Sequence, residues 1–510
     1  MRYFLILPLL LCSFHVIGQS NEFIFGNGVG NCIVSTRNKC HVVTGQIRTA
    51  QSLRLFLMKL DSAGSISTLH TYADGTEFIS EGKYLVDLPN EGYMIAGRIM
   101  HDTISNYEIT LLKTDTTGAV QWSKHYGNPF RDDQVTGILR LANGYLLVGY
   151  SSGYTPGGED GLIIRVDDSG NTIWSNTYGL SRNERAMKAL SLQGKYFIGC
   201  EGDAPVASDQ DIYLMQIDTS GNISINIEIV IPGDQHLHDM IESPDGALLI
   251  AASTQSGGPS DMILMKVMPP STIQWSKVIT GVNAIPQSLS LSPAGFSICG
   301  SLTQSTAVEN GFVVEMDLNG NIVRQEVFGN ASQCNINSLL FEGDTMKAVG
   351  RFTKPGNYSS SVFVSSYHNG DSACAHIQGS MSTATQNATT SIVGWQKAAQ
   401  GMTAVTAAVA RINFSVNDSS VCDVTSSVQE VIRRSFELSP NPTTGKLKLK
   451  LVGISDSYET IVYSIDGREI LRKPGSGRQA ELDVTSLSPG LYSIQIVSRE
   501  GIISGNFVKQ

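Results

Sequence analysis

A short segment recurs along the chain, and this recurrence limits the possible folds more than any other feature of the sequence. It reads TDTTGAVQWSKHYG at 114–127, VDDSGNTIWSNTYG at 166–179 and MDLNGNIVRQEVFG at 316–329. Each copy has a polar turn built on an Asp and a Gly, then an alternating run that ends in an aromatic-Gly step. Such a turn is typical of tight hairpins, because Gly takes positive φ without strain and Asp bonds to nearby backbone. We therefore expect each copy to be a β-hairpin.

Two apolar runs accompany the hairpin and set the length of the repeat. One run ends in a small residue, as in HVVTG, YMIAG and YLLVG, and the other leads into the turn, as in LFLMKLD, ITLLKTD and LIIRVD. Each kind of run occurs seven times, about every fifty residues. Four short strands fit this period, which is typical of a β-propeller blade. The sequence predicts an all-β chain whose residues 19–378 form a seven-bladed β-propeller.

The repeats also predict how the ring closes. The segment NEFIFGNG at 21–28 resembles the end of the recurring hairpin, and the last repeat lacks such an ending. We expect Phe23 to Phe25 to supply the outer strand of the last blade, which would remove the open edge of the ring. In the other blades the strand that carries Trp122, Trp174 or Trp275 is expected to be outermost, with its Trp packed between sheets.

Composition and the first residues indicate export rather than nucleic-acid binding. The net charge is −10 and only 16% of residues are charged, and no long basic run is present, so nucleic acid is not an expected partner. Residues 1–18 have a short positive start and an apolar run, which predicts a secretory signal peptide. No later stretch is apolar enough to predict a transmembrane segment.

An oxidising destination permits disulfide bonds. Cys32 and Cys40 flank a short turn, and Cys374 and Cys422 bracket a Ser/Thr/Ala-rich segment, so these four are the candidate disulfide residues. The three other cysteines after the signal peptide lie in apolar runs and are expected to be buried thiols. The pairing itself stays open, and the odd number leaves one thiol free unless it pairs between chains.

The periodicity stops after the last repeat. Residues 379–424 are expected to be extended strands packed on the propeller, with a short helix in their Ala-rich middle as the alternative, and 425–435 predicts a linker. Residues 436–510 contain SPNPTTGKLKLKL, then IDGREI, then LSPGLYSIQIV, and end in FVKQ. This order resembles the type A C-terminal sorting domain of the type IX secretion system of Bacteroidetes. The matching positions include Pro440, Asn441, Pro442, Gly445, Gly467, Leu487, Gly490, Tyr492 and Lys509.

The resemblance implies a small β-sandwich that the outer-membrane translocon recognises, and a protein that is released or held at the cell surface. The whole chain is similar to the Bacteroidetes surface proteins that join a repeat propeller to such a tail. The resemblance implies no ligand.

The candidate binding residues lie in the loops that should share one face of the propeller. They are mostly acidic: Asp132, Asp133, Glu159, Asp160, Asp209, Asp234, His236, His238 and Asp239. A solvated acidic rim would explain them, and the functional interpretation is a patch for a glycan, a cation or a basic protein. His236 and His238 should face the same side of a strand, but a zinc site needs a third ligand and none is near in sequence. No metal or cofactor is therefore expected.

Two functions are compatible with these features. The first is a non-enzymatic surface propeller that binds a glycan or a protein. The alternative is a secreted hydrolase or lyase that acts on polysaccharide with two carboxylates of the acidic face.

Overall fold

The computed structural model describes residues 21–510 with internal gaps, and all of its regular elements are β-strands. The chain divides into two compact units, Met1–Cys422 and Asp423–Gln510. The segments outside the described residues are 1–20, 50–51, 63, 74–78, 102–105, 128–130, 153–157, 180–181, 204–208, 256–259, 280–282, 304–307, 330–332, 354–359, 369–375, 379–380, 382, 387, 393–395, 400–404, 407–409, 414–417, 421–434, 453–457, 465–467, 478 and 499–500. The expected signal peptide, Cys374, Cys422 and Gly467 fall in these segments.

The first unit is built from antiparallel four-stranded sheets that follow one another along the chain. A representative sheet consists of β10 (Asp133–Leu141), β11 (Gly144–Ser152), β12 (Glu159–Val166) and β13 (Thr172–Gly179), paired in that order. Further sheets of the same order are formed by β2 (Gly28–Ser35), β3 (His41–Arg48), β4 (Leu53–Leu60) and β5 (Ile66–Ala73); β6 (Ile79–Leu88), β7 (Gly92–Met100), β8 (Glu108–Thr114) and β9 (Val120–Tyr126); β14 (Glu184–Leu192), β15 (Lys195–Asp203), β16 (Gln210–Ile217) and β17 (Ile223–Val230); β18 (Asp234–Glu242), β19 (Leu248–Gln255), β20 (Asp261–Met268) and β21 (Thr272–Ile279); and β22 (Ala284–Ser292), β23 (Gly295–Thr303), β24 (Glu309–Met316) and β25 (Ile322–Phe328).

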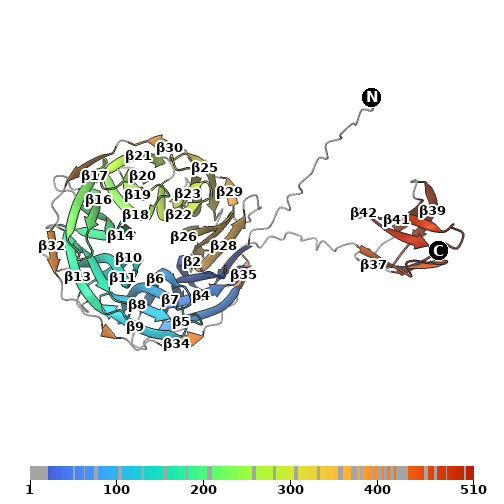
Figure 1. Cartoon of the computed structure of the whole chain (residues 1–510), viewed down its shortest axis with the longest axis horizontal. Coiled ribbons are helices and arrows are strands. Elements are labelled where there is room, and N and C mark those ends of the chain that lie inside the picture. Colours follow the sequence, from blue (N-terminus) through green and yellow to red (C-terminus); the bar gives the residue numbers. More distant parts are fainter. Residues whose placement is uncertain are drawn as a thin grey trace, which may run out of the picture. The chain divides into compact units, whose positions relative to one another are not determined.

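The sheets lie side by side in a ring, with the first strand of each nearest the centre (Figure 1). Neighbouring first strands touch all the way round, including β2 against β26 (Gln333–Glu342) of the last repeat. Apolar side chains between adjacent sheets form one cluster for each pair of neighbours, so the core is a series of clusters around the ring. The first unit is therefore β-propeller-like, as the repeat period predicted.

The N-terminal strand closes the ring, as expected from the sequence. β1 (Asn21–Phe25) pairs antiparallel with β28 (Ser361–His368), which follows β27 (Thr345–Thr353) in the last repeat. Ile24 is buried in the cluster that contains Phe328 and Phe363, whereas Phe25 is buried in the cluster that contains Val43 and Phe56. This one strand thus packs against the repeats on both sides of the junction.

A belt of short strands surrounds the outside of the ring. It consists of β29 (His376–Gln378), β30 (Thr383–Thr385), β31 (Thr389–Ile392), β32 (Gln396–Ala399), β33 (Val405–Thr406), β34 (Ala410–Asn413) and β35 (Asp418–Ser420). Their antiparallel partners are, in the same order, β25, β21, β17, β13, β9, β5 and β1, so the belt runs opposite to the order of the repeats. The expectation that the Trp-bearing strand is outermost was wrong, because the belt adds a fifth strand that pairs its edge.

The recurring segment forms the turn between the third and fourth strands. In one copy, Asp167 Oδ1 accepts hydrogen bonds from the backbone N–H of Ser169 (2.9 Å) and Asn171 (2.7 Å). Gly170 has φ +74° and donates its N–H to the Asp167 carbonyl at 3.0 Å. Asp115, Asp218 and Asp317 hold their turns in the same way, which explains why Asp and Gly recur together.

The same segment also carries the contact to the next sheet. The Trp122 ring lies against Gly170 of the following turn, where an added Cβ would be 2.8 Å from the ring. The Tyr126 hydroxyl donates to the Gly170 carbonyl at 2.6 Å. Trp174 and Trp275 lie against Gly221 and Gly320 in the same way.

In one pair of neighbouring sheets, β14–β17 and β18–β21, both partners lack the residues that make this contact. β17 has Ile225 and Ile229 where β9 has its Trp and Tyr, and the turn of the following sheet at 268–272 contains neither Asp nor Gly. The missing aromatics and the missing Asp-Gly turn belong to the same interface. The segment therefore recurs because each copy packs on the next.

The second unit consists of two sheets that share one apolar core. One sheet contains β36 (Ser435–Ser439), β37 (Lys446–Val452) and β40 (Gln479–Asp483), and the other contains β38 (Tyr458–Tyr463), β39 (Glu469–Gly475), β41 (Gly490–Ser498) and β42 (Gly501–Lys509). Leu449 and Leu482 from the first sheet are buried with Val462, Ile494 and Phe507 from the second. This is the small sandwich that the sequence predicted.

Candidate functional site

A β-bulge occurs at the same point of every first strand and leaves one extra residue there without a partner in the register. The bulged positions are Asn31, Lys83, Thr136, Met187, His238, Gln287 and Asn337. Several of them donate to the backbone carbonyl just before the bulge of the next sheet: Asn31 to Gly82 (2.8 Å), Thr136 to Ala186 (2.5 Å) and Asn337 to Gly30 (2.8 Å). The bulges thus join the inner strands to one another.

The positions directly after the bulges form a layer around the centre of the ring. In it, Lys188 Nζ lies 2.6 Å from Asp239 Oδ1, and Asp239 Oδ2 accepts the backbone N–H of Leu289 at 2.8 Å. Burial lowers the pKa of Lys188, but the Asp239 carboxylate outweighs this effect and the pKa is raised. Asp239 is therefore an internal ion-pair partner, and its expected place on a solvated acidic rim was wrong.

Charged, amide and aromatic side chains lie near the starts of the first strands and the ends of the second strands. We call this set the polar network. Its members are Glu81, Arg98, Tyr107, Asp132, Gln134, Tyr150, Glu159, Arg185, Glu201 and His236. They come from the first strands β6, β10, β14 and β18, from the ends of the second strands β7, β11 and β15, and from the adjoining loops and third-strand starts. Four of its members lie on first strands, which are the strands nearest the centre of the ring (Figure 1).

Arg98 organises one half of the polar network. Its Nε donates to Glu81 Oε2 at 2.8 Å, and its Nη1 donates to Gln134 Oε1 at 3.2 Å. The guanidinium carbon lies 4.3 Å from the centre of the Tyr107 ring, a cation–π distance. Gln134 in turn donates to Asp132 Oδ1 at 3.0 Å. These bonds hold the guanidinium between a carboxylate, an amide and a ring.

Arg185 organises the other half. Its Nε donates to Glu159 Oε2 at 2.5 Å, its Nη1 donates to Glu201 Oε1 at 3.2 Å, and its guanidinium lies 4.9 Å from the centre of the Tyr150 ring. His236 Nδ1 lies 3.7 Å from Glu201 Oε2. Both halves therefore repeat one motif, an arginine stacked on a tyrosine and held by carboxylate or amide oxygens.

The charges of Arg98 and Arg185 both affect the ionisation of the Tyr150 hydroxyl. Burial raises the pKa of Tyr150, and the charges of both Arg185 and Arg98 oppose this shift. Burial also opposes ionisation of Glu201, but the hydrogen bond and charge of His236 and the charge of Arg185 lower its pKa. The pKa of His236 is raised by its bond to Glu201. These two shifts favour the charged forms of Glu201 and His236.

The residues predicted from sequence fall into different environments. Asp132, Glu159 and His236 belong to the polar network, whereas Asp133 and Asp160 are almost fully buried. The face is therefore a mixed-charge surface rather than an acidic rim.

The remaining predicted residues lie around the start of β16 and β18. Asp209 and Asp234 are partly exposed, and Asp234 Oδ1 accepts the backbone N–H of Gln210 at 3.1 Å. His238 is the bulged residue, and its Nε2 bonds to Ser253 Oγ at 2.8 Å. Burial lowers the pKa of His238 to about 4. The bulge breaks the alternation that was assumed for the two histidines, so they have different partners.

Sequence reasoning missed most of the polar network. Arg98, Tyr150 and Glu201 occupy equivalent positions in the second strand, each directly after the small residue that ends the apolar run. An alignment of the repeats by that small residue would have placed these variable polar side chains in one layer.

The structure does not bring the candidate disulfide residues Cys32 and Cys40 together. Both are free thiols, and Cys32 is opposite Thr44 across the β2–β3 hairpin rather than opposite Cys40. The register places the two cysteines at different heights along the hairpin. Cys374 and Cys422 lie outside the described residues.

One cluster of side chains in the described ranges has the composition of a metal site. It consists of His101, Glu108 and His125, from the outer part of the β6–β9 sheet. The sequence did not predict this set, because its members are up to 24 positions apart and form no local motif. It is separate from the polar network.

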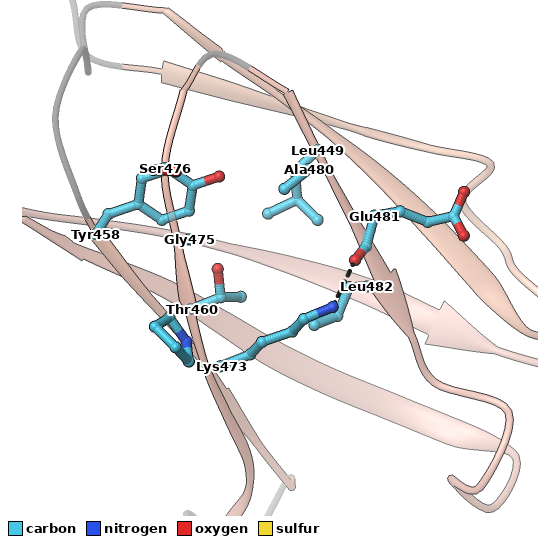
Figure 2. Close-up of a pocket in the computed structure, with 10 residues that line it drawn as sticks. Leu449, Tyr458, Thr460, Lys473, Gly475, Ser476, Ala480, Glu481 and Leu482 are labelled. Atoms are coloured by element: carbon cyan, nitrogen blue, oxygen red, sulfur yellow. Dashed lines mark hydrogen bonds between the residues drawn. The ribbon is translucent and has the colours of Figure 1, made fainter.

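In the second unit, a pocket of about 390 Å³ lies between β39 and β40. Figure 2 shows Tyr458, Thr460 and Lys473 around it, with Lys473 Nζ donating to the Glu481 carbonyl at 3.2 Å. Gly475 borders the pocket against the Tyr458 ring, where an added Cβ would come within 2.4 Å.

The predicted sorting residues hold the two ends of the second unit together. Asn441 Oδ1 accepts the N–H of Val508 at 2.9 Å, next to a parallel bridge between Thr443 and Lys509. The Tyr492 ring stacks on Phe507 at 5.5 Å and its hydroxyl donates to the Ser488 carbonyl at 2.9 Å.

The turns of this unit account for further sorting positions. The Gly445 carbonyl accepts the N–H of Val484 at 2.7 Å, and Leu487 donates its N–H to the Val484 carbonyl at 3.1 Å. Gly490 begins β41, and Pro440 and Pro442 flank Asn441 in the loop after β36. These positions therefore shape the loops and the core of the domain.

The sheets and the tail together define the chain as a β-propeller-like repeat protein with a separate C-terminal β-sandwich. Residues 437–510 match the family described as secretion system C-terminal sorting domain. This segment is a C-terminal sorting domain, which interacts with the type IX secretion machinery. The protein is therefore exported by that system and is secreted or located at the outer cell surface.

Comparison with other known proteins adds no functional assignment. No curated protein matches the chain. Similar solved structures include Sqt1 from Chaetomium thermophilum, with 11% identity over 65% of this chain and 84% of that chain and a TM-score of 0.34. Another is the full extracellular region of plexin A4, with 9% identity over 96% of this chain and 53% of that chain and a TM-score of 0.28. In the part of the chain that the structure describes, no helix is long and apolar enough to span a membrane.

Proposed function

We propose that this protein is a secreted or surface-held, seven-bladed β-propeller that binds a glycan at the polar network without chemical turnover. In this proposal residues 1–18 are a signal peptide, 19–378 form the propeller, 379–424 are the belt region, 425–435 link the units and 436–510 sort the chain. The observation that carries the proposal is the repeated arginine–tyrosine motif, Arg98 on Tyr107 and Arg185 on Tyr150.

The motif suits a sugar because it offers two kinds of contact side by side. Guanidinium and carboxylate groups bond to hydroxyls in fixed directions, and a tyrosine ring supplies an apolar face with a polar tip. The network also holds its own charged groups in place, since Arg185 bonds to both Glu159 and Glu201. Binding to such a pre-ordered surface loses little side-chain entropy.

The alternative, a polysaccharide hydrolase or lyase, is supported less well. A glycosidase acid needs a carboxyl group whose pKa is raised so that it stays protonated near neutral pH. In the polar network the pKa of Glu81 and that of Glu201 are lowered, because nearby cations outweigh the effect of burial. These carboxylates are suited to hold a ligand rather than to donate a proton.

Glycan arrays and calorimetry with the full-length protein test the proposal. Arg185→Lys keeps the charge but loses the planar fork, and we expect roughly 10- to 100-fold weaker binding from the loss of charge-assisted hydrogen bonds. Arg324→Lys is the matched control, because Arg324 on β25 pairs with Glu315 on β24 at 3.5 Å, away from the polar network. Binding that survives Arg185→Lys unchanged would contradict the proposal, and turnover of a polysaccharide that depends on Glu159 would favour the hydrolase.

A further inference from the structure

Two histidines and one glutamate meet at the outer part of the β6–β9 sheet. His101 directly follows β7, Glu108 begins β8 and His125 lies in β9. Each offers one ligand atom, and these atoms all lie within 4.8 Å of one another. The two imidazole rings are 5.7 Å apart between centroids. The cluster contains three metal-ligating groups from three neighbouring parts of one sheet.

The strand register explains why the three side chains share a face. Glu108 is opposite Ile99, and His101 lies two positions after Ile99. Thr110 lies two positions after Glu108 and is opposite His125. Side chains two positions apart on a strand point to the same face of a sheet. The pleat therefore brings the three groups together without an unusual backbone.

The surroundings make the cluster partly enclosed. His125 is 5% exposed, and His101 and Glu108 are partly exposed. On its outer side β9 pairs with the belt, where Val405 is opposite His125. The set is therefore anchored on packed strands, and solvent reaches it past His101 and Glu108.

We propose that His101, Glu108 and His125 bind a zinc ion. Zinc takes imidazole nitrogen and carboxylate oxygen at about 2.0–2.2 Å, so ligand atoms around a tetrahedral ion are roughly 3.4 Å apart. Atoms that already lie within 4.8 Å reach this separation by small side-chain rotations. Two nitrogen ligands disfavour calcium and magnesium, which prefer oxygen.

Three protein ligands leave the fourth position of the ion to water or to a donor atom of a bound molecule. The ion would also fasten β7, β8 and β9 to one another at their outer ends. Zinc is thus expected to stabilise the folded first unit, because a site assembled by folding favours the folded state.

Metal titration of the full-length protein tests this inference. After dialysis against a chelator, we expect one zinc ion per chain at micromolar protein concentration, and cobalt in its place should show the visible absorption of a four-coordinate ion. Glu108→Gln and His101→Ala should each weaken binding by at least roughly 100-fold, since even the loss of a partner behind a ligand costs 10- to 100-fold. Glu242→Gln, an exposed glutamate on β18, is the matched control and should bind as the natural chain does.

A second measurement keeps the test independent of folding. Zinc should raise the thermal unfolding temperature of the natural chain and of Glu242→Gln, but not that of Glu108→Gln, with circular dichroism showing that all three are folded without metal. Failure of the natural chain to take up zinc would overturn the inference. Equal zinc affinity in all variants would overturn it as well, because the metal would then be held adventitiously elsewhere.

Discussion

Replacing Gly170 with alanine tests the claim that the recurring segment persists because each copy packs on the next. Gly170 has φ +74°, and an added Cβ would lie 2.8 Å from the Trp122 ring of the preceding sheet. Gly194, in the β14–β15 turn, has nearly the same φ, +75°, but an added Cβ would meet nothing within 4 Å. The two glycines therefore share the backbone strain and differ in the contact.

The expected loss of stability follows from these two terms. Alanine in the left-handed region costs roughly 1–2 kcal/mol at either position. Pushing a packed aromatic ring away costs roughly 1–3 kcal/mol more, and only at Gly170. Gly170→Ala should therefore lower the free energy of unfolding by about 2–5 kcal/mol, and Gly194→Ala by about 1–2 kcal/mol.

Urea unfolding of the full-length chain, followed by circular dichroism, measures the difference with the same signal whether or not Trp122 is present. In a Trp122→Ala background the excess cost of Gly170→Ala should disappear, since the added methyl group then has space. Equal losses at Gly170 and Gly194 would refute the reasoning. An excess that persists without Trp122 would also refute it.

Three further predictions concern closure, titration and sorting. Phe25→Ala should lower the free energy of unfolding by about 3–5 kcal/mol, because this side chain is 2% exposed between the last and first repeats. A loss below about 1 kcal/mol in urea unfolding would show that β1 does not close the ring. Burial and the neighbouring Glu228 raise the pKa of Asp211 to about 7. The folded state therefore binds this proton more tightly than the unfolded chain, in which the pKa of an Asp is about 3.9. The free energy of unfolding should fall as the pH rises from about 4 to 7. Asp211→Asn should reduce this slope while the exposed Asp344→Asn does not, and an unchanged slope in Asp211→Asn would contradict the assignment. Deleting 437–510 should leave a folded first unit inside the cell envelope, as shown by fractionation of a native host, and normal export of the truncated chain would contradict the sorting role.

The features that repeat or that follow local rules were predictable from the amino-acid sequence. The Asp-Gly turn, the four-strand period and the copy of the hairpin ending at Phe23 to Phe25 are properties of neighbouring residues, and each predicted a strand or a turn where the structure has one. The sorting domain was recognisable for the same reason, since its Pro-Asn-Pro and Leu-x-x-Gly-x-Tyr elements are local and ordered.

Which side chains meet depends on the packing of distant segments and was not predictable in this way. The belt strands have two to four residues each and are too short to show a period in the sequence. They form strands because they pair with the outer edge strands of the sheets. Arg98 and Arg185 are 87 positions apart, on the second strand of one sheet and the first strand of a later one, and only the closed ring brings both into the polar network. The bulge at His238 and the burial of Asp239 likewise depend on the neighbouring inner strands. Contacts between distant parts of a chain are set by packing, and no local pattern records them.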